Sequence, residues 1–384
     1  MKTSYIGSVV VALMSLLTCA AQATCDSIEV NNNNTPPDAS SVFVISSPGS
    51  YCLGANVVGV AGKNGIKIDA DNVTLDLAGF GVLGVGGSLS GILINNHFHI
   101  VVRNGSISGW SSHGLDGTSG ALSRIEDLRT DANGGNGLVI NSGSQVSNCV
   151  AAQNTGVGIA VSNNVLVTGC VSSLNGGHGF GLGTACTIKS CLAYGNGGAG
   201  IATGGVNYLT VIDCNANTNT GGGIAARARA FITSSTAEGN GVVGISAGAS
   251  STISNSHASG NTGDGIIASN GSAVTGCTAS ANTGDGIEVD NLSRIEGNTC
   301  QGNGVGMADG AGVHVTGRAN RVDGNTVTRN DRGIDVDSGG NLVVRNDASH
   351  NPTNYDIAGG NENANVELPP PNFILDRPWA NFRH

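Results

Sequence analysis

The chain has 384 residues, of which 62 are glycine, while only 11% are charged and 4% are aromatic. Its 17 lysines and arginines against 27 aspartates and glutamates give a formal charge of −10, which argues against a nucleic-acid partner. A disordered chain would carry more charge and fewer aliphatic residues, and collagen would need glycine at every third position.

The first 23 residues have the pattern of a secretory signal peptide. Lys2 precedes an apolar run over residues 9–17, and Ala21-Gln22-Ala23 offers small residues for cleavage. A membrane anchor and a lipid anchor at Cys19 are the alternatives, but the apolar run is short for a membrane span. We therefore expect an exported protein, periplasmic or extracellular, that does not span the membrane.

A repeat of about 21 residues runs through most of the chain. Asparagine recurs at positions 133, 154, 175, 196, 219, 240, 261, 282, 303, 330 and 351. Glycine and an aliphatic residue follow most of these asparagines, as at Gly158-Ile159 and Gly265-Ile266. Such a period, with short aliphatic runs between Gly/Asn turns, predicts a solenoid of stacked β-strands. Each asparagine is then expected to point inward and to bond its equivalents on the coils above and below.

The cysteines follow the same period. Cys149, Cys170, Cys191, Cys214 and Cys277 are equivalent positions, with serine at 235 and 256 between them. We expect this series to be a buried row of small side chains rather than a metal site or a series of disulfides.

Cys25 and Cys52 lie outside that series, at the two ends of an N-terminal segment. In an oxidising compartment they could form one disulfide.

Earlier segments also match the repeat, although less strictly, so we expect the solenoid to cover residues 63–357. This corresponds to roughly thirteen coils and a length of about 60 Å at about 4.8 Å per coil. Open solenoid ends expose strands, so both ends need caps. Residues 24–62 are the expected N-terminal cap. Residues 358–384 are the expected C-terminal cap, which the prolines at 369–371 separate from the last coil.

Three segments give a resemblance to a known family. Residues 47–53 (SPGSYCL), 72–80 (NVTLDLAGF) and 101–105 (VVRNG) resemble bacterial right-handed parallel β-helix repeat proteins of the pectate-lyase-like superfamily, and residues 378–382 (PWANF) resemble the tail of exported members. The resemblance implies an all-β, single-stranded right-handed parallel β-helix. It also implies a carbohydrate-related role, because the superfamily includes pectate lyases, polygalacturonases and alginate epimerases.

Acidic residues are concentrated near the C-terminal end of the solenoid. Residues 132–263 contain two, whereas the shorter stretch 264–356 contains twelve. When the coils are aligned, Glu288, His314 and Asp335 form one outward row, and Asp290, Thr316 and Asp337 form a second. Earlier coils place Ala160, Gly181, Ala202, Ala225, Ser246 and Ile267 on the first row. Ionisable groups therefore gather where one coil is lengthened to 27 residues.

These residues support three chemical interpretations. The carboxylates of Glu288, Asp290, Asp335 and Asp337 could act in pairs, since Cα spacings of about 6.8 and 9.6 Å lie near those of inverting glycosidases. Alternatively, Asp290, Asp335 and Asp337 could hold Ca²⁺, which takes oxygen ligands. His314 could then act as the base of a β-elimination, as in a polysaccharide lyase. In the third interpretation, the bound Ca²⁺ serves stability alone.

Substrate contacts are expected from Arg318, Arg321 and Asp309, which lie on the lengthened coil. The partner would be a polysaccharide or a cell-surface glycan, and we expect a monomer. A structural or adhesive cell-surface protein is the alternative, because the same residues could form an exposed polar face that has no catalytic or binding role. Asp-Pro-His and the polygalacturonase motifs other than Gly177-His178-Gly179 are absent.

Overall fold

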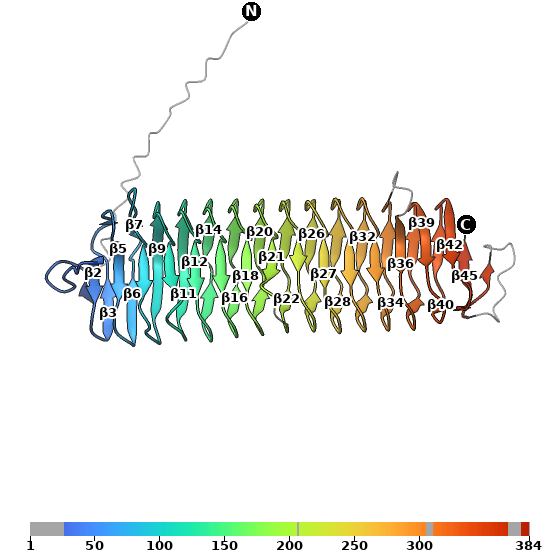
Figure 1. Ribbon diagram of the computed structural model, residues 1–384, viewed down its shortest axis with the longest axis horizontal. Coiled ribbons are helices and arrows are strands. Elements are labelled where there is room, and N and C mark those ends of the chain that lie inside the picture. Colours follow the sequence, from blue (N-terminus) through green and yellow to red (C-terminus); the bar gives the residue numbers. More distant parts are fainter. Residues whose placement is uncertain (1–26, 206, 305–309, 368–377, 384) are drawn as a thin grey trace, which may run out of the picture.

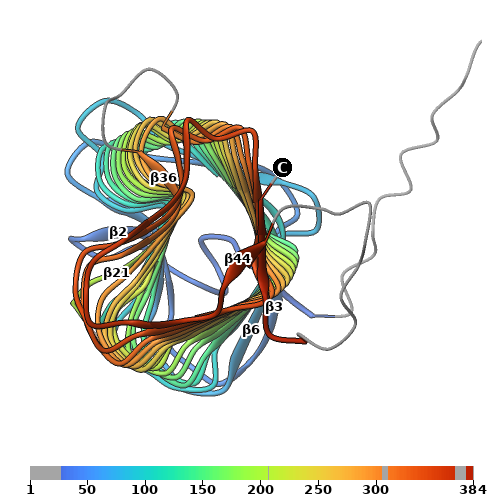
Figure 2. The same ribbon diagram turned by 90° about the vertical axis from the view of Figure 1, so that its right-hand side faces the viewer.

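The computed structural model describes residues 27–205, 207–304, 310–367 and 378–383. Within these ranges the chain winds into a long rod of stacked coils, with the early strands at one end and the late strands at the other (Figure 1). Viewed along the rod, successive coils superimpose on one closed outline (Figure 2). In the described part of the chain, no helix is long and apolar enough to cross a bilayer.

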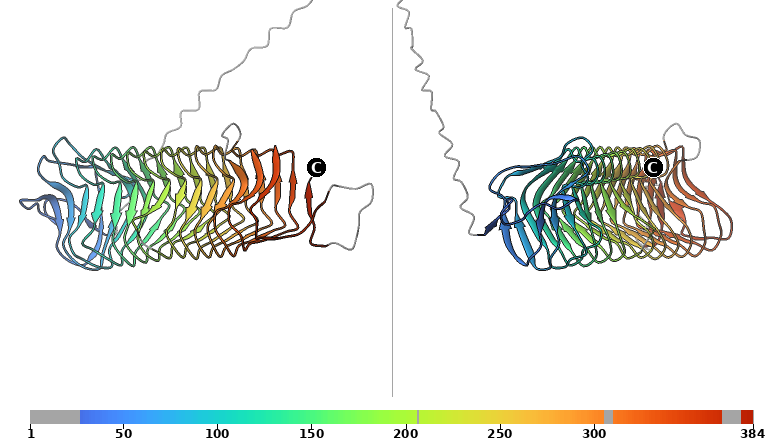
Figure 3. Two further views of the ribbon diagram at one scale, coloured as in Figure 1. Left: turned by 45° about the vertical axis from the view of Figure 1, so that its right-hand side comes forward. Right: turned by 60° about the vertical axis from the view of Figure 1, so that its left-hand side comes forward.

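One sheet contains a single strand from every coil, and all of its strands are parallel. Its fifteen strands are β2 (Ser41–Ile45), β5 (Asn64–Ile68), β8 (Ile92–Ile94), β10 (Leu115–Gly117), β12 (Leu138–Ile140), β15 (Ile159–Val161), β18 (Phe180–Leu182), β21 (Ile201–Thr203), β24 (Ile224–Ala225), β27 (Ile245–Ala247), β30 (Ile266–Ala268), β33 (Ile287–Val289), β36 (Ala311–Val315), β39 (Arg332–Val336) and β42 (Thr353–Ile357). We call this surface the long sheet. The two views in Figure 3 show its strands in continuous register along the rod.

The remaining strands form a 30-stranded sheet to which a regular coil contributes two short strands. A typical pair is β13 (Gln145–Ser147) and β14 (Val150–Ala152), which stack on β16 (Leu166–Thr168) and β17 (Val171–Ser173) of the next coil. The all-β, right-handed parallel β-helix expected from the sequence is therefore the observed fold. Fifteen coil strands exceed the roughly thirteen expected coils, in part because β2, which lies in the segment expected to be a cap, already pairs with β5 of the solenoid.

The asparagine series forms a continuous hydrogen-bonded ladder inside the rod. Asn240, for example, donates from Nδ2 to the Ala216 carbonyl (2.9 Å) and to Oδ1 of Asn261 (3.0 Å), and its own Oδ1 accepts from Asn219. The same contacts repeat from Asn133 to Asn351. A buried amide is tolerated here because each of its donors and acceptors finds a partner on the adjacent coil.

The cysteine row is buried and its members are free thiols, as expected. Burial raises the pKa of Cys277 to about 11, so this thiol stays neutral. Farther along, the same row continues with Asn298, Asn325 and Asn346. Cys52 is disulfide-bonded, and its expected partner Cys25 lies outside the described residues.

Glycine is required where the turn of one coil lies close to the next. A Cβ at Gly244 would lie 2.6 Å from Nδ2 of Asn261 and 2.7 Å from the Gly265 carbonyl oxygen. The glycine that follows each ladder asparagine therefore leaves room for the asparagine of the following coil.

The C-terminal residues return to the rod. β45 (Asn381–Arg383) pairs with β41 (Asp347–Ser349), and Asn381 accepts from Nδ2 of Asn346 at 3.2 Å. The guanidinium of Arg345 lies over the Trp379 ring, 5.1 Å from its centroid. The tail thus terminates one internal asparagine ladder with a further asparagine.

Candidate functional site

The two predicted outward rows lie at the C-terminal end of the long sheet. Glu288 of β33 pairs with His314 of β36, which pairs with Asp335 of β39. The next residue in this row is Asp356 on β42. In the second row, Thr316 donates its hydroxyl to Oδ1 of Asp290 at 3.3 Å. The alternation of buried aliphatic and outward polar residues thus places the ionisable groups on one face.

Toward the N-terminal end, the first row continues with uncharged side chains, which are small except for Ile267. Ala202, Ala225, Ser246 and Ile267 are consecutive members, and Ile267 pairs directly with Glu288. These four residues line a trough of about 430 Å³ on the outer face of the long sheet. The trough therefore ends beside the first carboxylate of the acidic cluster.

His314 is held between two carboxylates. Its Nδ1 lies 2.8 Å from Oδ2 of Asp285, and its Nε2 lies 3.2 Å from Oδ2 of Asp337. The hydrogen bond that His314 donates to Asp285, together with the charges of its acidic neighbours, raises the pKa of His314 to about 9. The ring is therefore a cation at neutral pH, which argues against the general-base role expected for it.

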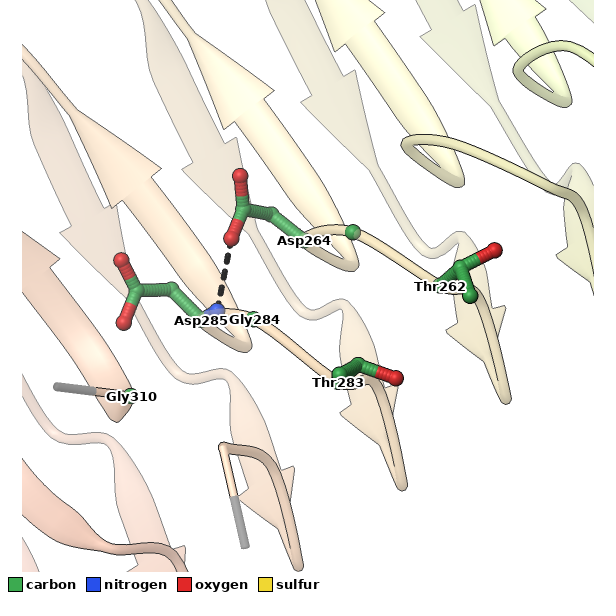
Figure 4. A pocket seen from close by; sticks show the side chains of 7 residues that line it. Thr262, Asp264, Thr283, Gly284, Asp285 and Gly310 are labelled. Atoms are coloured by element: carbon green, nitrogen blue, oxygen red, sulfur yellow. Dashed lines mark hydrogen bonds between the residues drawn. The ribbon is translucent and has the colours of Figure 1, made fainter. Parts of the chain in front are cut away.

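Asp285 owes its position to a turn that repeats along the rod. In this turn, Oδ1 of Asp264 accepts from the backbone N–H of Asp285 at 2.7 Å, and Oδ1 of Asp285 accepts from the N–H of Ala311 at 2.5 Å. Figure 4 shows the two carboxylates projecting in the same direction from neighbouring turns, beside a pocket of about 230 Å³. Asp285 is thus fixed at both oxygens, one of them by His314.

Glu288 lies half-buried next to this fixed carboxylate. The ligand atoms of Asp285, Glu288 and His314 are all within 4.8 Å of one another. Two full negative charges at that distance would repel by about 3.5 kcal/mol at an effective dielectric constant of about 20. Burial, joined by the charges of Asp264 and Asp285, accordingly raises the pKa of Glu288. The pKa values of Asp264 and Asp335 are raised by burial as well, and Glu288 is the member of this group that lies in the outward row next to the trough.

Asp335 is a buried partner of an arginine. Its Oδ2 accepts from the guanidinium of Arg332, whose Nε lies 3.8 Å from Oδ2 of Asp356. Burial raises the pKa of Asp335, although Arg332 opposes the shift. Because its side chain is only 5% exposed, Asp335 is less accessible to a polymer than Glu288 or Asp290.

Of the three expected substrate-binding residues, Arg318 and Arg321 lie in the described part of the chain. Arg321 lies on β37 (Arg321–Asp323) of the 30-stranded sheet, where its guanidinium binds the buried carboxylate of Asp323. Arg321 aligns with Arg294 in a different strand of the coil from the acidic rows. Arg318 is exposed in the turn after β36, and Asp309 lies outside the described residues.

The geometry gives little support to the expected Ca²⁺ ligands Asp290, Asp335 and Asp337. Among the described residues, two groups of three possible ligands lie close together, namely Asp285–Glu288–His314 and His314–Asp335–Asp337. Asp290 belongs to neither group, and each contains a histidine nitrogen. Ca²⁺ prefers a shell of oxygen atoms. His314 and Arg332 already supply positive charge to these carboxylates.

Replacing His314 by Gln tests the protonation of this cluster. The folded pKa of His314 is raised from 6.5 to about 9. The stabilisation of the folded protein by the ion pairs of protonated His314 is therefore complete below pH 6.5, and it is lost as the pH rises through about 9. We expect the wild-type advantage in free energy of unfolding, measured by urea titration, to shrink across this interval. His257→Gln on β29 (His257–Ser259), which makes no ion pair with the described residues, is the control. An advantage that grows with pH would contradict the arrangement.

A family model described as "Right handed beta helix region" matches residues 90–240 and 227–349. No curated protein matches the sequence.

Several solved structures are similar to the fold. The A-module of the Azotobacter vinelandii mannuronan C-5 epimerase AlgE6 has a TM-score of 0.48 at 16% identity, covering 78% of this chain and 90% of that one. The catalytic domain of a GH87 α-1,3-glucanase in complex with nigerose has a TM-score of 0.47 at 11% identity, with coverages of 76% and 62%. The periplasmic alginate epimerase AlgG has a TM-score of 0.39 at 12% identity, with coverages of 92% and 80%. These values are too low to transfer a substrate or a reaction to this chain.

Proposed function

Because the chain belongs to the right-handed β-helix family, we propose that its long sheet binds a polysaccharide and that Glu288 begins hydrolysis of the bound chain. The observation that carries this proposal is the half-buried Glu288 carboxyl, with its raised pKa, at the end of the trough. A proton donor next to an extended groove is what cleavage of a glycosidic bond requires.

In the proposed reaction, Glu288 donates its proton to the glycosidic oxygen while the bond from that oxygen to the anomeric carbon breaks. Asp290, two residues along the same strand face, accepts a proton from the water that forms the new bond. Their Cα spacing of about 6.8 Å leaves room for the water of an inverting mechanism. The His314 cation stabilises the Glu288 carboxylate that remains, and Asp285 holds the His314 ring.

Hydrolysis is favoured over β-elimination for two reasons. His314 is protonated and cannot accept the proton that a lyase must remove. In addition, the sugar carboxylate on which elimination depends would be repelled by the carboxylates of Asp285 and Asp290. We therefore propose an uncharged sugar at the cleaved bond. Export to the periplasm or the cell exterior would bring the protein to such polymers.

A polysaccharide panel tests the reaction class. We expect new reducing ends with inverted anomeric configuration, no ultraviolet absorbance from an unsaturated product, and equal rates with Ca²⁺ and with EDTA. An unsaturated product would contradict hydrolysis, and loss of activity in EDTA would contradict a metal-independent site. Saturable binding without product would instead support a non-catalytic glycan-binding protein.

A further inference from the structure

Arg227 lies at the side of the trough and has no salt bridge to the described residues. It follows Ala225 of β24 by two residues, as Asp290 follows Glu288 of β33, so Arg227 lies in the second row. Its side chain is exposed and lines the trough. No carboxylate of the described residues forms a salt bridge with it.

Pairing is the common state of arginine on this rod. Seven arginines form salt bridges with aspartate or glutamate, namely Arg103, Arg124, Arg129, Arg294, Arg321, Arg332 and Arg345. Arg227 differs in lining a groove while keeping its guanidinium available. A free guanidinium is suited to bind an anionic group with two parallel hydrogen bonds.

The surroundings of Arg227 fit a sugar chain. The trough floor is made of small side chains except for Ile267, and Ser246 and Ser269 offer hydroxyl groups. His178 also lines the trough, and its Nδ1 accepts from the N–H of Ala199 at 2.9 Å. The trough thus combines shallow apolar contacts with hydrogen-bonding groups, as binding a polyhydroxylated chain requires.

The guanidinium of Arg227 lies several coils away from the acidic cluster. Arg227 and Asp290 are three coils apart in the second row, about 14 Å at about 4.8 Å per coil. The Debye length at physiological ionic strength is about 8 Å, so exposed charges at the two positions act largely independently. An anionic group at Arg227 is therefore compatible with an uncharged sugar at Glu288.

We propose that the trough binds an acidic heteropolysaccharide, with the carboxylate of one sugar on Arg227 and uncharged sugars at Glu288. This inference rests on the proposed function for the position of cleavage. It adds a specificity-determining residue three coils away, and it requires a polymer that contains both acidic and uncharged sugars.

The test measures binding to Glu288→Gln protein by calorimetry, which avoids turnover. The probes are acidic heteropolysaccharides, each used beside its carboxyl-reduced form. We expect the carboxylated form of at least one probe to bind tenfold more tightly, with the preference weakened by salt. Arg227→Gln should abolish the preference, whereas Arg229→Gln, an exposed arginine that stacks on Tyr208, should retain it.

Equal binding of both forms, or an unchanged preference in Arg227→Gln, would overturn the inference. Those results would leave hydrolysis by Glu288 intact if neutral polymers were still cleaved. Conversely, the wild-type protein could show no turnover while the preference for the carboxylated form still depends on Arg227. That result would support the binding site and reject the proposed reaction.

Discussion

Replacing Glu288 by Gln is expected to lower kcat on the cleaved polysaccharide at least a hundredfold. The amide has nearly the same shape as the carboxyl group but cannot donate the proton that the leaving oxygen needs. Loss of general acid catalysis usually costs about 10²–10⁴-fold. The melting temperature should remain unchanged or rise slightly, because the substitution removes a carboxyl group from the vicinity of Asp264 and Asp285.

The matched control is Glu238→Gln on β26 (Thr236–Glu238), an exposed glutamate of the 30-stranded sheet. It should keep wild-type turnover. The pH profile gives a second readout, because wild-type activity should fall as the pH rises through the elevated pKa of Glu288. Undiminished turnover in Glu288→Gln would reject Glu288 as the acid.

Replacing Asn240 by Ala is expected to destabilise the rod by about 3–5 kcal/mol. The change removes the side-chain donor to the Ala216 carbonyl and the acceptor of the Asn219 backbone and side-chain N–H groups, all in the interior. Oδ1 of Asn261 loses one of its two donors and keeps the backbone N–H of residue 240. Each buried group left without a partner costs about 1–3 kcal/mol. Water cannot replace these contacts unless the coils separate, so chemical denaturation should report the full loss.

Asn215→Ala on β23 (Asn215–Asn217) is the control, since this asparagine is exposed and makes no side-chain hydrogen bond with the described residues. It should change the free energy of unfolding by less than about 0.5 kcal/mol. Equal losses in the two variants would mean that the internal ladder does not stabilise the fold more than surface asparagines do.

Much of the candidate site could be predicted from the repeat alone. A fixed period of 21 residues assigns Glu288, His314 and Asp335 to one row, because parallel strands in register stack equivalent positions. The lengthened coil did not disturb this prediction, since its extra residues precede β36. The coil count was less secure, because the first coils carry weaker repeats.

Asp285 and Asp264 were missed because they lie in turns. The alternation of inward and outward side chains along a strand does not apply to a turn, so the sequence does not fix the direction of a turn side chain. In addition, the equivalent turn position holds His178 or Ala199 in other coils. The available signal was that aspartate occupies this turn in two successive coils beside the acidic rows. Arg332 was missed for a related reason: the alternating pattern does not show that its guanidinium reaches Asp335.

The sequence by itself determined the β-helix, the inward asparagine and cysteine rows and the outward acidic face, since each follows from a repeated spacing and from strand alternation. Only the tertiary structure decided the chemistry of that face. It placed Asp285 against His314, directed Arg321 to Asp323 on the other sheet, and left Arg227 beside the trough without a salt bridge to the described residues. Protonation and pairing depend on distances of a few ångströms between side chains of different coils, and a repeat period specifies positions on the backbone but not those distances.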